Sequence, residues 1–272
     1  MTPKLPILHL TSLPFLLSAI ACGPSEEAFA RSVVTSTLQT SQQQQMTDEV
    51  IDDRCSAITA EAAAADAAAR PAALLYPASC VDKTADGPNL HVAFDRCTGP
   101  FGRVELNGGV DARFEVVGSC ELRADVSDAG NLTVNHRPLA YQATAGIEVV
   151  GGTYDIDWDA HFSTTTRRGK EVEQVSALRV VMDRQTSCRR IDGEAQGHVA
   201  NFEYDWEVEN LSVCPGECPA SGVVHAGWEG RRREHAITVE FDGSSTARVT
   251  GWSGRAFDVP MVCEDAETDD EG

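Results

Sequence analysis

The feature that most constrains the fold is an alternation of apolar and polar residues that continues from about residue 74 to residue 263. It is clearest in the segments 90–95, 111–116, 121–126 and 237–242. Such a period of two predicts antiparallel strands with one buried and one solvated face. Turn sequences rich in Gly, Asp and Asn separate the segments, giving roughly ten to twelve strands in succession. The sequence predicts a mainly β domain, an antiparallel meander forming an open or half-closed barrel; the alternative is a two-sheet β-sandwich.

The residues around this β domain differ in composition. Residues 22–46 are rich in Ser, Thr and Gln without a sustained apolar period, which predicts a disordered tether. Residues 47–73 form an Ala-rich stretch that Thr47 can cap and that Pro71 stops, which predicts one helix. The acidic residues 264–272 predict a disordered tail.

The N-terminal residues 1–21 have the pattern of an export signal. One cation, Lys4, precedes a short apolar run that ends in the small residues Ala19 and Ala21. Cys22 follows at once, and a Cys at this position is typical of a lipobox, where bacteria acylate the thiol and cleave before it. A soluble secretion signal and a retained membrane span are the alternatives. We expect a lipid-anchored protein of the bacterial cell envelope, and Gly23, in place of an inner-membrane retention Asp, favours the outer membrane.

Cysteine counting supports an exported protein. If lipid modifies Cys22, an even number of Cys remains for disulfides in an oxidising compartment. Eight Cys allow 105 connectivities. The predicted pairs are Cys80 with Cys97, Cys188 with Cys214, Cys218 with Cys263 and, from the two that are left, Cys55 with Cys120.

Composition and motifs exclude several classes of function. The formal net charge of -20 argues against nucleic acid or an anionic membrane surface as a partner. The sequence contains no metalloprotease, nucleophile-elbow or phosphate-loop motif, and its His residues are scattered. We therefore expect a protein that is not an enzyme and carries no cofactor.

Two strands combine an acidic face with an aromatic face. In residues 154–162 the carboxylates of Asp155, Asp157 and Asp159 share one side, and residues 202–209 repeat the pattern with Glu207. Alternating Asp residues are typical of the start of a calcium loop, but Ala160 stands where such a loop needs Gly. The three Asp residues are thus a weak calcium candidate, and no metal is predicted. A hydrolase using acidic-strand carboxylates such as Asp157 and Glu207 is the alternative function.

The aromatic faces of the same strands suggest a ligand site. Trp158, Phe162, Tyr204 and Trp206 would point inward on a curled sheet, and aromatic concavities in half-closed barrels hold lipids or other apolar ligands. The same pattern is also typical of an ordinary core. The sequence therefore predicts a protein that binds a hydrophobic ligand on this face or serves a structural or adhesive role.

Two turn motifs carry a family resemblance. The segments C-T-G-P-F-G at 97–102 and C-P-G-E-C-P-A-S-G at 214–222, with the closing strands up to Cys263, resemble an uncharacterised group of bacterial lipoproteins. In that group an Ala-rich helix precedes a long run of antiparallel strands. The resemblance covers residues 55–263 and implies an envelope lipoprotein without an assigned activity.

Overall fold

The structure is a computed structural model that describes residues 25–45, 59–69, 75–98, 105–118, 120–215, 217–230, 233–261 and 263. The predicted signal and Cys22, the predicted tail and the greater part of the predicted helix lie outside these residues. The helices are α2 (Glu26–Gln45), α3 (Ala60–Ala69) and the short η1 (Ala78–Cys80). The strands are β1 (Val81–Asp86), β2 (Asn89–Thr98), β3 (Glu105–Val116), β4 (Glu121–Asp128), β5 (Thr133–Val134), β6 (Arg137–Pro138), β7 (Ala140–Val150), β8 (Thr153–Thr165), β9 (Glu171–Asp183), β10 (Arg189–Val199), β11 (Phe202–Val213), β12 (Ser221–Gly230), β13 (Arg233–Phe241), β14 (Thr246–Thr250) and β15 (Ala256–Pro260).

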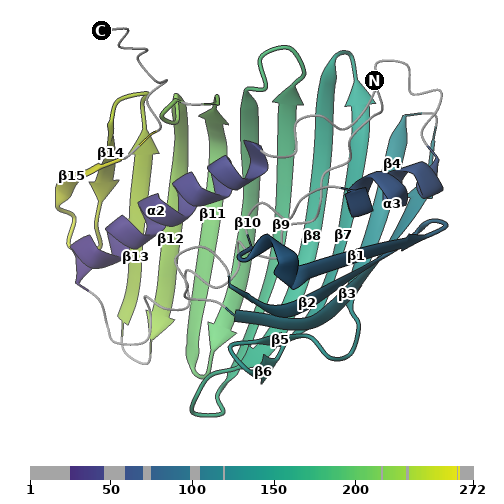
Figure 1. Cartoon of the computed structure of the whole chain (residues 1–272). Helices are drawn as coiled ribbons and strands as arrows, with labels where there is room; N and C mark the ends of the chain where they lie inside the picture. Colours follow the sequence, from purple (N-terminus) through teal and green to yellow (C-terminus); the bar gives the residue numbers. More distant parts are fainter. Residues whose placement is uncertain are drawn as a thin grey trace, which may run out of the picture.

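All fifteen strands belong to one antiparallel sheet in which neighbours in sequence are neighbours in space (Figure 1). Only β5 and β6 lie off the main path, where they pair with β3 and with each other. The mainly β meander is thus confirmed, although it has more strands than the ten to twelve predicted. The sheet curls but stays open, with β1 and β15 at opposite ends of the strand order, and the two-sheet sandwich does not occur.

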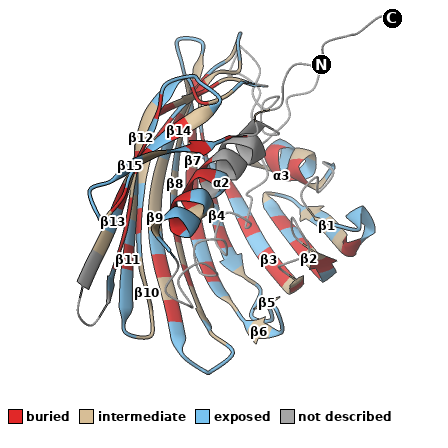
Figure 2. Ribbon diagram, turned by 90° about the vertical axis from the view of Figure 1, so that its left-hand side faces the viewer, coloured by how far each residue is buried: buried red, intermediate tan, exposed pale blue. Residues whose placement is uncertain are grey.

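The alternation read from the sequence appears directly as alternating burial along the strands (Figure 2). In β4, for example, Leu122, Ala124 and Val126 are buried while the residues between them are exposed. The buried side chains share one face of the sheet, which we call the inner face, and helices α2 and α3 pack on it (Figure 1). The opposite face, here called the outer face, carries the polar side chains.

Helix α3 confirms the described part of the predicted Ala-rich helix. The Thr59 hydroxyl accepts a hydrogen bond from the Ala62 amide at 3.1 Å and so caps the first turn. Ala63, Ala64 and Ala67 lie on one face and are buried against β1, β2 and β3. Because Ala side chains are small, the helix backbone approaches the sheet closely.

Helix α2 corrects the predicted tether at 22–46. The Ser25 hydroxyl accepts a hydrogen bond from the Ala28 amide at 3.3 Å, and Glu26 and Glu27 favour the positive end of the helix dipole. Phe29, Ala30, Val33, Val34 and Thr37 form a stripe at helical spacing, and all are buried. The many Ser, Thr and Gln residues of this segment made the stripe hard to recognise from the sequence. The stripe is narrow, but it is sufficient to dock the helix on the sheet.

Aromatic contacts and one carboxylate fix the start of α2 to the C-terminal strands. The Phe29 ring meets Trp228 edge-on at a centroid distance of 4.4 Å, and Trp252 lies 5.0 Å from Trp228. The Glu26 carboxylate accepts hydrogen bonds from the Ser253 amide at 3.2 Å and from its hydroxyl at 3.0 Å. The first helix therefore contacts the turn between β14 and β15, near the other end of the chain.

Three of the four predicted disulfides are present. Cys80 bonds to Cys97, Cys188 to Cys214 and Cys218 to Cys263. Cys120 is disulfide-bonded as well, but its predicted partner Cys55 lies outside the described residues, so that pair stays a prediction. Disulfides of this number indicate a non-cytoplasmic, oxidising compartment.

Candidate functional site

Strand register arranges the polar side chains of the outer face in rows that cross the sheet. Two neighbouring rows span β2 to β10. The first consists of Asn89, Arg113, Asp125, Thr144, Asp159, Ala177 and Glu194. The second consists of His91, Asp111, Ser127, Gln142, His161, Val175 and Gln196.

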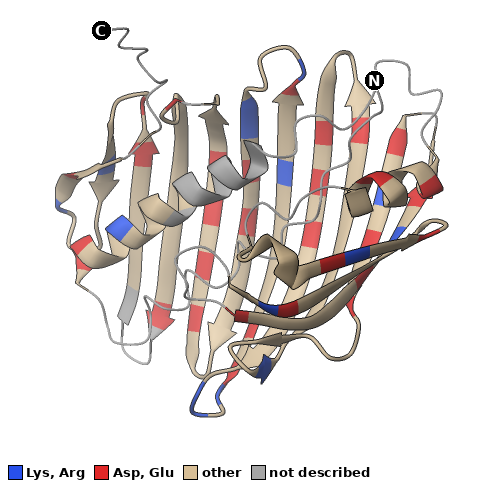
Figure 3. Cartoon of the chain, in the orientation of Figure 1, with Lys and Arg blue, Asp and Glu red and all other residues tan. Residues whose placement is uncertain are grey.

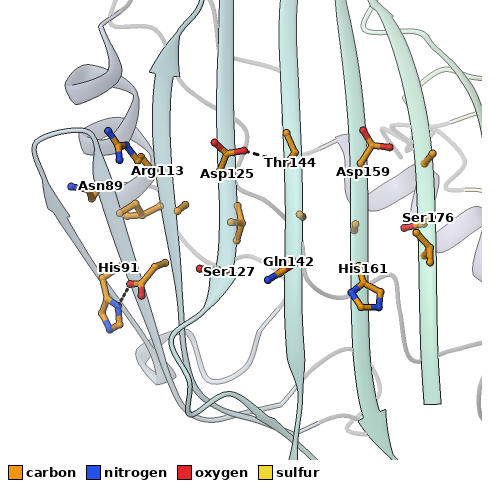
Figure 4. A pocket seen from close by; sticks show the side chains of 18 of the residues that line it. Asn89, His91, Arg113, Asp125, Ser127, Gln142, Thr144, Asp159, His161 and Ser176 are labelled. Atoms are coloured by element: carbon orange, nitrogen blue, oxygen red, sulfur yellow. Dashed lines mark hydrogen bonds and ion pairs between the residues drawn. The ribbon is translucent and has the colours of Figure 1, made fainter. Parts of the chain in front are cut away.

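These rows line a groove on the outer face with a volume of about 1030 Å³ (Figure 4). It crosses the strands from β1 to β10, and each strand that it crosses contributes two or three lining residues. The volume is at the upper end of the range typical of small-molecule sites, about 300–1,000 Å³. Most of the lining residues are polar, and Val175 and Ala177 provide an apolar strip along β9.

Several groove side chains are held in place by cross-strand contacts. Nδ1 of His91 lies 2.7 Å from a carboxylate oxygen of Asp111, and the Thr144 hydroxyl donates to Asp125 at 3.2 Å. Both contacts are drawn in Figure 4. Nε2 of His161 lies 2.8 Å from a carboxylate oxygen of Glu173, at the groove margin. These contacts fix the orientation of several groove side chains before any ligand binds.

The groove has a marked excess of negative charge. Its lining contains five carboxylates and one guanidinium, that of Arg113; the carboxylates are Asp86, Asp111, Asp125, Asp159 and Glu194. Neither Asp159 nor Glu194 forms an ion pair with another described residue. Glu194 also stands directly opposite Glu207 of β11, and like charges at opposed positions destabilise a sheet. This part of the outer face is therefore charged at some cost to stability.

One acidic residue elsewhere on the outer face, Asp155, is neutralised by an arginine. Two guanidinium nitrogens of Arg179 donate to the two carboxylate oxygens of Asp155, the first at 2.9 Å. This hydrogen bonding holds the pKa of Asp155 below its ordinary value. Asp157 lies opposite the same arginine in the strand register.

The three calcium candidates do not share one environment. Asp155 is bound to Arg179, Asp157 lies between the two, and Asp159 lines the groove. Alternate residues along a strand are also about 6.6 Å apart, since each residue rises by about 3.3 Å. Across the parts of the chain that the structure describes, no three His, Cys, Asp or Glu side chains are grouped so that they could hold a metal ion.

The suggested hydrolytic pair does not converge. Asp157 lies on β8 and Glu207 on β11, so β9 and β10 separate them. Three strand spacings amount to about 14 Å, whereas paired glycosidase carboxylates lie about 5–9.5 Å apart. The two residues therefore cannot act on one glycosidic bond.

The four aromatic residues proposed for an apolar ligand all belong to strands whose aromatic side chains face inward, but they differ in exposure. Phe162 and Tyr204 are core residues, 3% and 5% exposed, whereas Trp158 and Trp206 are half-buried. The Tyr204 hydroxyl donates to the buried side-chain oxygen of Gln174 at 2.8 Å, and burial raises its pKa, so it stays a donor. Only the two tryptophans have surface to offer a ligand.

Most of the groove residues were not recognised as a site from the sequence. The alternation placed His91, Asp111, Arg113 and Asp125 on solvated strand faces, but it gave no register between strands. A row across the sheet combines residues from positions 89 to 196, and only the pairing of consecutive hairpins determines which residues meet.

An open antiparallel sheet with two helices on one face and a polar groove on the other defines this molecule. No protein-family model, curated protein or solved structure matches the chain. The resemblance to bacterial lipoproteins therefore stays a prediction. None of the helices within the described ranges has the length and hydropathy needed to cross a bilayer.

Proposed function

We propose that this chain is a lipid-anchored protein of the bacterial cell envelope that binds a cationic, polar ligand in the groove of its outer face and does not catalyse a reaction. The observation that carries the proposal is the groove itself, with five lining carboxylates, one lining arginine and unpaired carboxylates at Asp159 and Glu194. A bound ammonium or guanidinium group would relieve the repulsion between Glu194 and Glu207. The disulfides and the lipobox pattern at Cys22 support the envelope location.

Shape and chemistry both favour an extended ligand. The groove crosses eight strands, and its carboxylates are distributed along it rather than gathered at one point. Asp159 and Glu194 lie two strand spacings apart, about 10 Å. A linear chain with several ammonium groups can contact these carboxylates in turn, while its methylene groups lie along Val175 and Ala177.

Titration calorimetry with spermine and with tetralysine tests the binding. The protein is the exported chain with Cys22→Ser, which keeps the disulfides and removes the lipid. The Asp159→Asn/Glu194→Gln variant should bind about tenfold to thirtyfold more weakly. The matched control Glu240→Gln/Asp258→Asn removes the same charge from exposed outer-face residues on β13 and β15.

The control should bind like the parent chain. An equal loss in both variants would mean that net charge, and not the groove, attracts the cation. No binding of either probe at low ionic strength would refute the proposal.

The lipid anchor has its own test. Metabolic labelling with a fatty acid in a bacterial host, followed by mass analysis, should detect acylation of the native chain and none on Cys22→Ser. Membrane fractionation then distinguishes the outer membrane from the inner one. An unacylated chain in the soluble fraction would favour secretion.

A hydrophobic ligand on the inner face is the second candidate. It is favoured by the partial exposure of Trp158 and Trp206, which lie between the parts of the sheet that α2 and α3 cover. Native mass spectrometry of the gently extracted chain should detect a bound lipid if this face is used. The bare polypeptide mass would leave the groove as the binding site.

A further inference from the structure

The turns of the meander divide into two ends, and the start of α2 lies at one of them. The turns after β8, β10 and β14 all lie at one end of the strands, because consecutive strands are antiparallel. The Glu26 carboxylate binds Ser253 in the turn between β14 and β15. We call this the anchor end, since the chain N-terminal to α2 starts from it.

Very little chain separates α2 from Cys22. Only three residues lie between Cys22 and Glu26, the first residue of the helix. At about 3.3–3.6 Å per residue, the four steps from Cys22 to Glu26 span at most about 14 Å. A lipid on Cys22 would therefore hold the anchor end within that distance of the bilayer surface.

Unpaired cations are concentrated at the same end. The β8–β9 turn carries Arg167, Arg168 and Lys170, all exposed and without an ion-pair partner among the described residues. Nη1 of Arg137 donates to the Thr165 carbonyl at 2.9 Å and so lies beside this turn. Figure 3 shows the basic turn at the lower edge of the sheet, below strands that carry mostly acidic residues.

Other side chains at this end also suit a lipid surface. Phe202 begins β11 and is 43% exposed, which is unusual for a large aromatic side chain. Arg255, in the β14–β15 turn that holds Glu26, is also exposed. Aromatic and basic side chains together are typical of residues at the level of lipid headgroups.

We propose that the anchor end binds the phosphate headgroups of the membrane that carries the lipid of Cys22, so that the strands stand on the bilayer. This inference rests on the proposed lipid anchor. The overall charge of -20 argued against an anionic membrane surface as a partner. The net charge of the whole chain does not show the local excess of cations on the turn 167–170. A basic patch would add an electrostatic attachment to that of the lipid.

The geometry also determines where the groove lies. His161 lines the groove four residues before β8 ends at Thr165, and the basic turn follows, so the groove would lie at least about 13 Å above the headgroups. It would therefore remain open to ligands in the aqueous phase.

Sedimentation with lipid vesicles tests the headgroup contact without the anchor. The Cys22→Ser chain is mixed at low ionic strength with vesicles of phosphatidylcholine alone or with added phosphatidylglycerol. Each basic side chain near an anionic surface changes binding about fivefold, so Arg167→Gln/Arg168→Gln should lower binding to the anionic vesicles by at least tenfold. The control Arg184→Gln/Arg190→Gln removes the same charge at the opposite end of the strands and should bind like the parent. Equal losses in both variants, or no preference of the parent for the anionic vesicles, would overturn the proposal.

A footprinting experiment adds orientation. A chain that begins at Cys22 is coupled through that thiol to maleimide-lipid vesicles, which supplies the anchor whether or not cells acylate the protein. Phenylglyoxal should then modify Arg167 and Arg168 at least fivefold more slowly than in solution. Arg190, which is 55% exposed at the opposite end, should react equally in both. Equal protection of both ends, or of neither, would overturn the orientation, whereas a failure of acylation in cells would affect only the proposed anchor.

Discussion

Removing the Phe29 side chain tests most directly whether α2 is a docked helix. Phe29 is 2% exposed and packs edge-on against Trp228 at 4.4 Å. Truncating a buried Phe to Ala costs about 3–5 kcal/mol. Because the sheet has its own core against α3 and along the strands, we expect Phe29→Ala to weaken the docking of α2 and not to unfold the sheet.

Hydrogen exchange with mass spectrometry measures this local effect. If α2 exchanges by local opening, a loss of about 3–5 kcal/mol accelerates exchange of the amides of Val33 and Val34 by about 10²–10³ or more. Exchange in the central strands should change little. The control is Thr35→Ala, which truncates an exposed side chain on the same helix.

One outcome of the exchange experiment would contradict a docked α2. If α2 exchanges in the parent chain as fast as an unstructured peptide, and Phe29→Ala leaves that rate unchanged, the helix is not docked in solution. The disordered tether predicted from the composition of this segment would then be correct. The link between Cys22 and the sheet would be flexible.

Three further perturbations test the interior, the disulfides and the outer face. Tyr204→Phe should lower the free energy of unfolding by about 1–3 kcal/mol, because it leaves a buried amide oxygen without its donor; a change below about 0.5 kcal/mol in urea denaturation would contradict this. Cys188→Ala/Cys214→Ala opens a loop of 26 residues and should cost about 3.5 kcal/mol by the chain-entropy relation, measured in the same way; an unchanged midpoint would argue against the disulfide. Arg179→Met should lower the free energy of unfolding slightly at pH 7, because it removes the partner of Asp155. Since the pKa of Asp155 is lowered in the folded chain, this contribution is present above the ordinary carboxyl pKa and is lost as the pH falls through the folded value, so parent and variant should converge in strong acid; a difference that stays constant as the pH falls would contradict the pairing.

The β domain could be predicted because its physical signal is local. Each strand alternates on its own, and each hairpin turn is marked by its own Gly, Asp or Asn, so neither needs knowledge of distant residues. The disulfide Cys80–Cys97 could be predicted for a related reason, since the hairpin of β1 and β2 brings these two residues together. The strand count fell short because β5, β6 and β14 are too short to show a period.

Helix α2 and the groove could not be predicted because both depend on distant partners. The stripe from Phe29 to Thr37 contains few large apolar side chains and becomes stable only against Trp228 and the strands that follow it. The groove depends on register across eight strands, and a shift by one residue in any pair would turn its side chains to the inner face. A single sequence reports composition and period but not register.

The contact between Glu26 and Ser253 joins residues 227 positions apart, and it has a consequence for the order in which an exported chain folds. In a chain that crosses a membrane N-terminus first, each new strand can pair with the strand just before it. Helix α2 enters first of all, yet its partners on β12 to β15 come last. Helix α2 therefore stays undocked until translocation is nearly complete. Its docking can occur only when the last strands of the sheet are present.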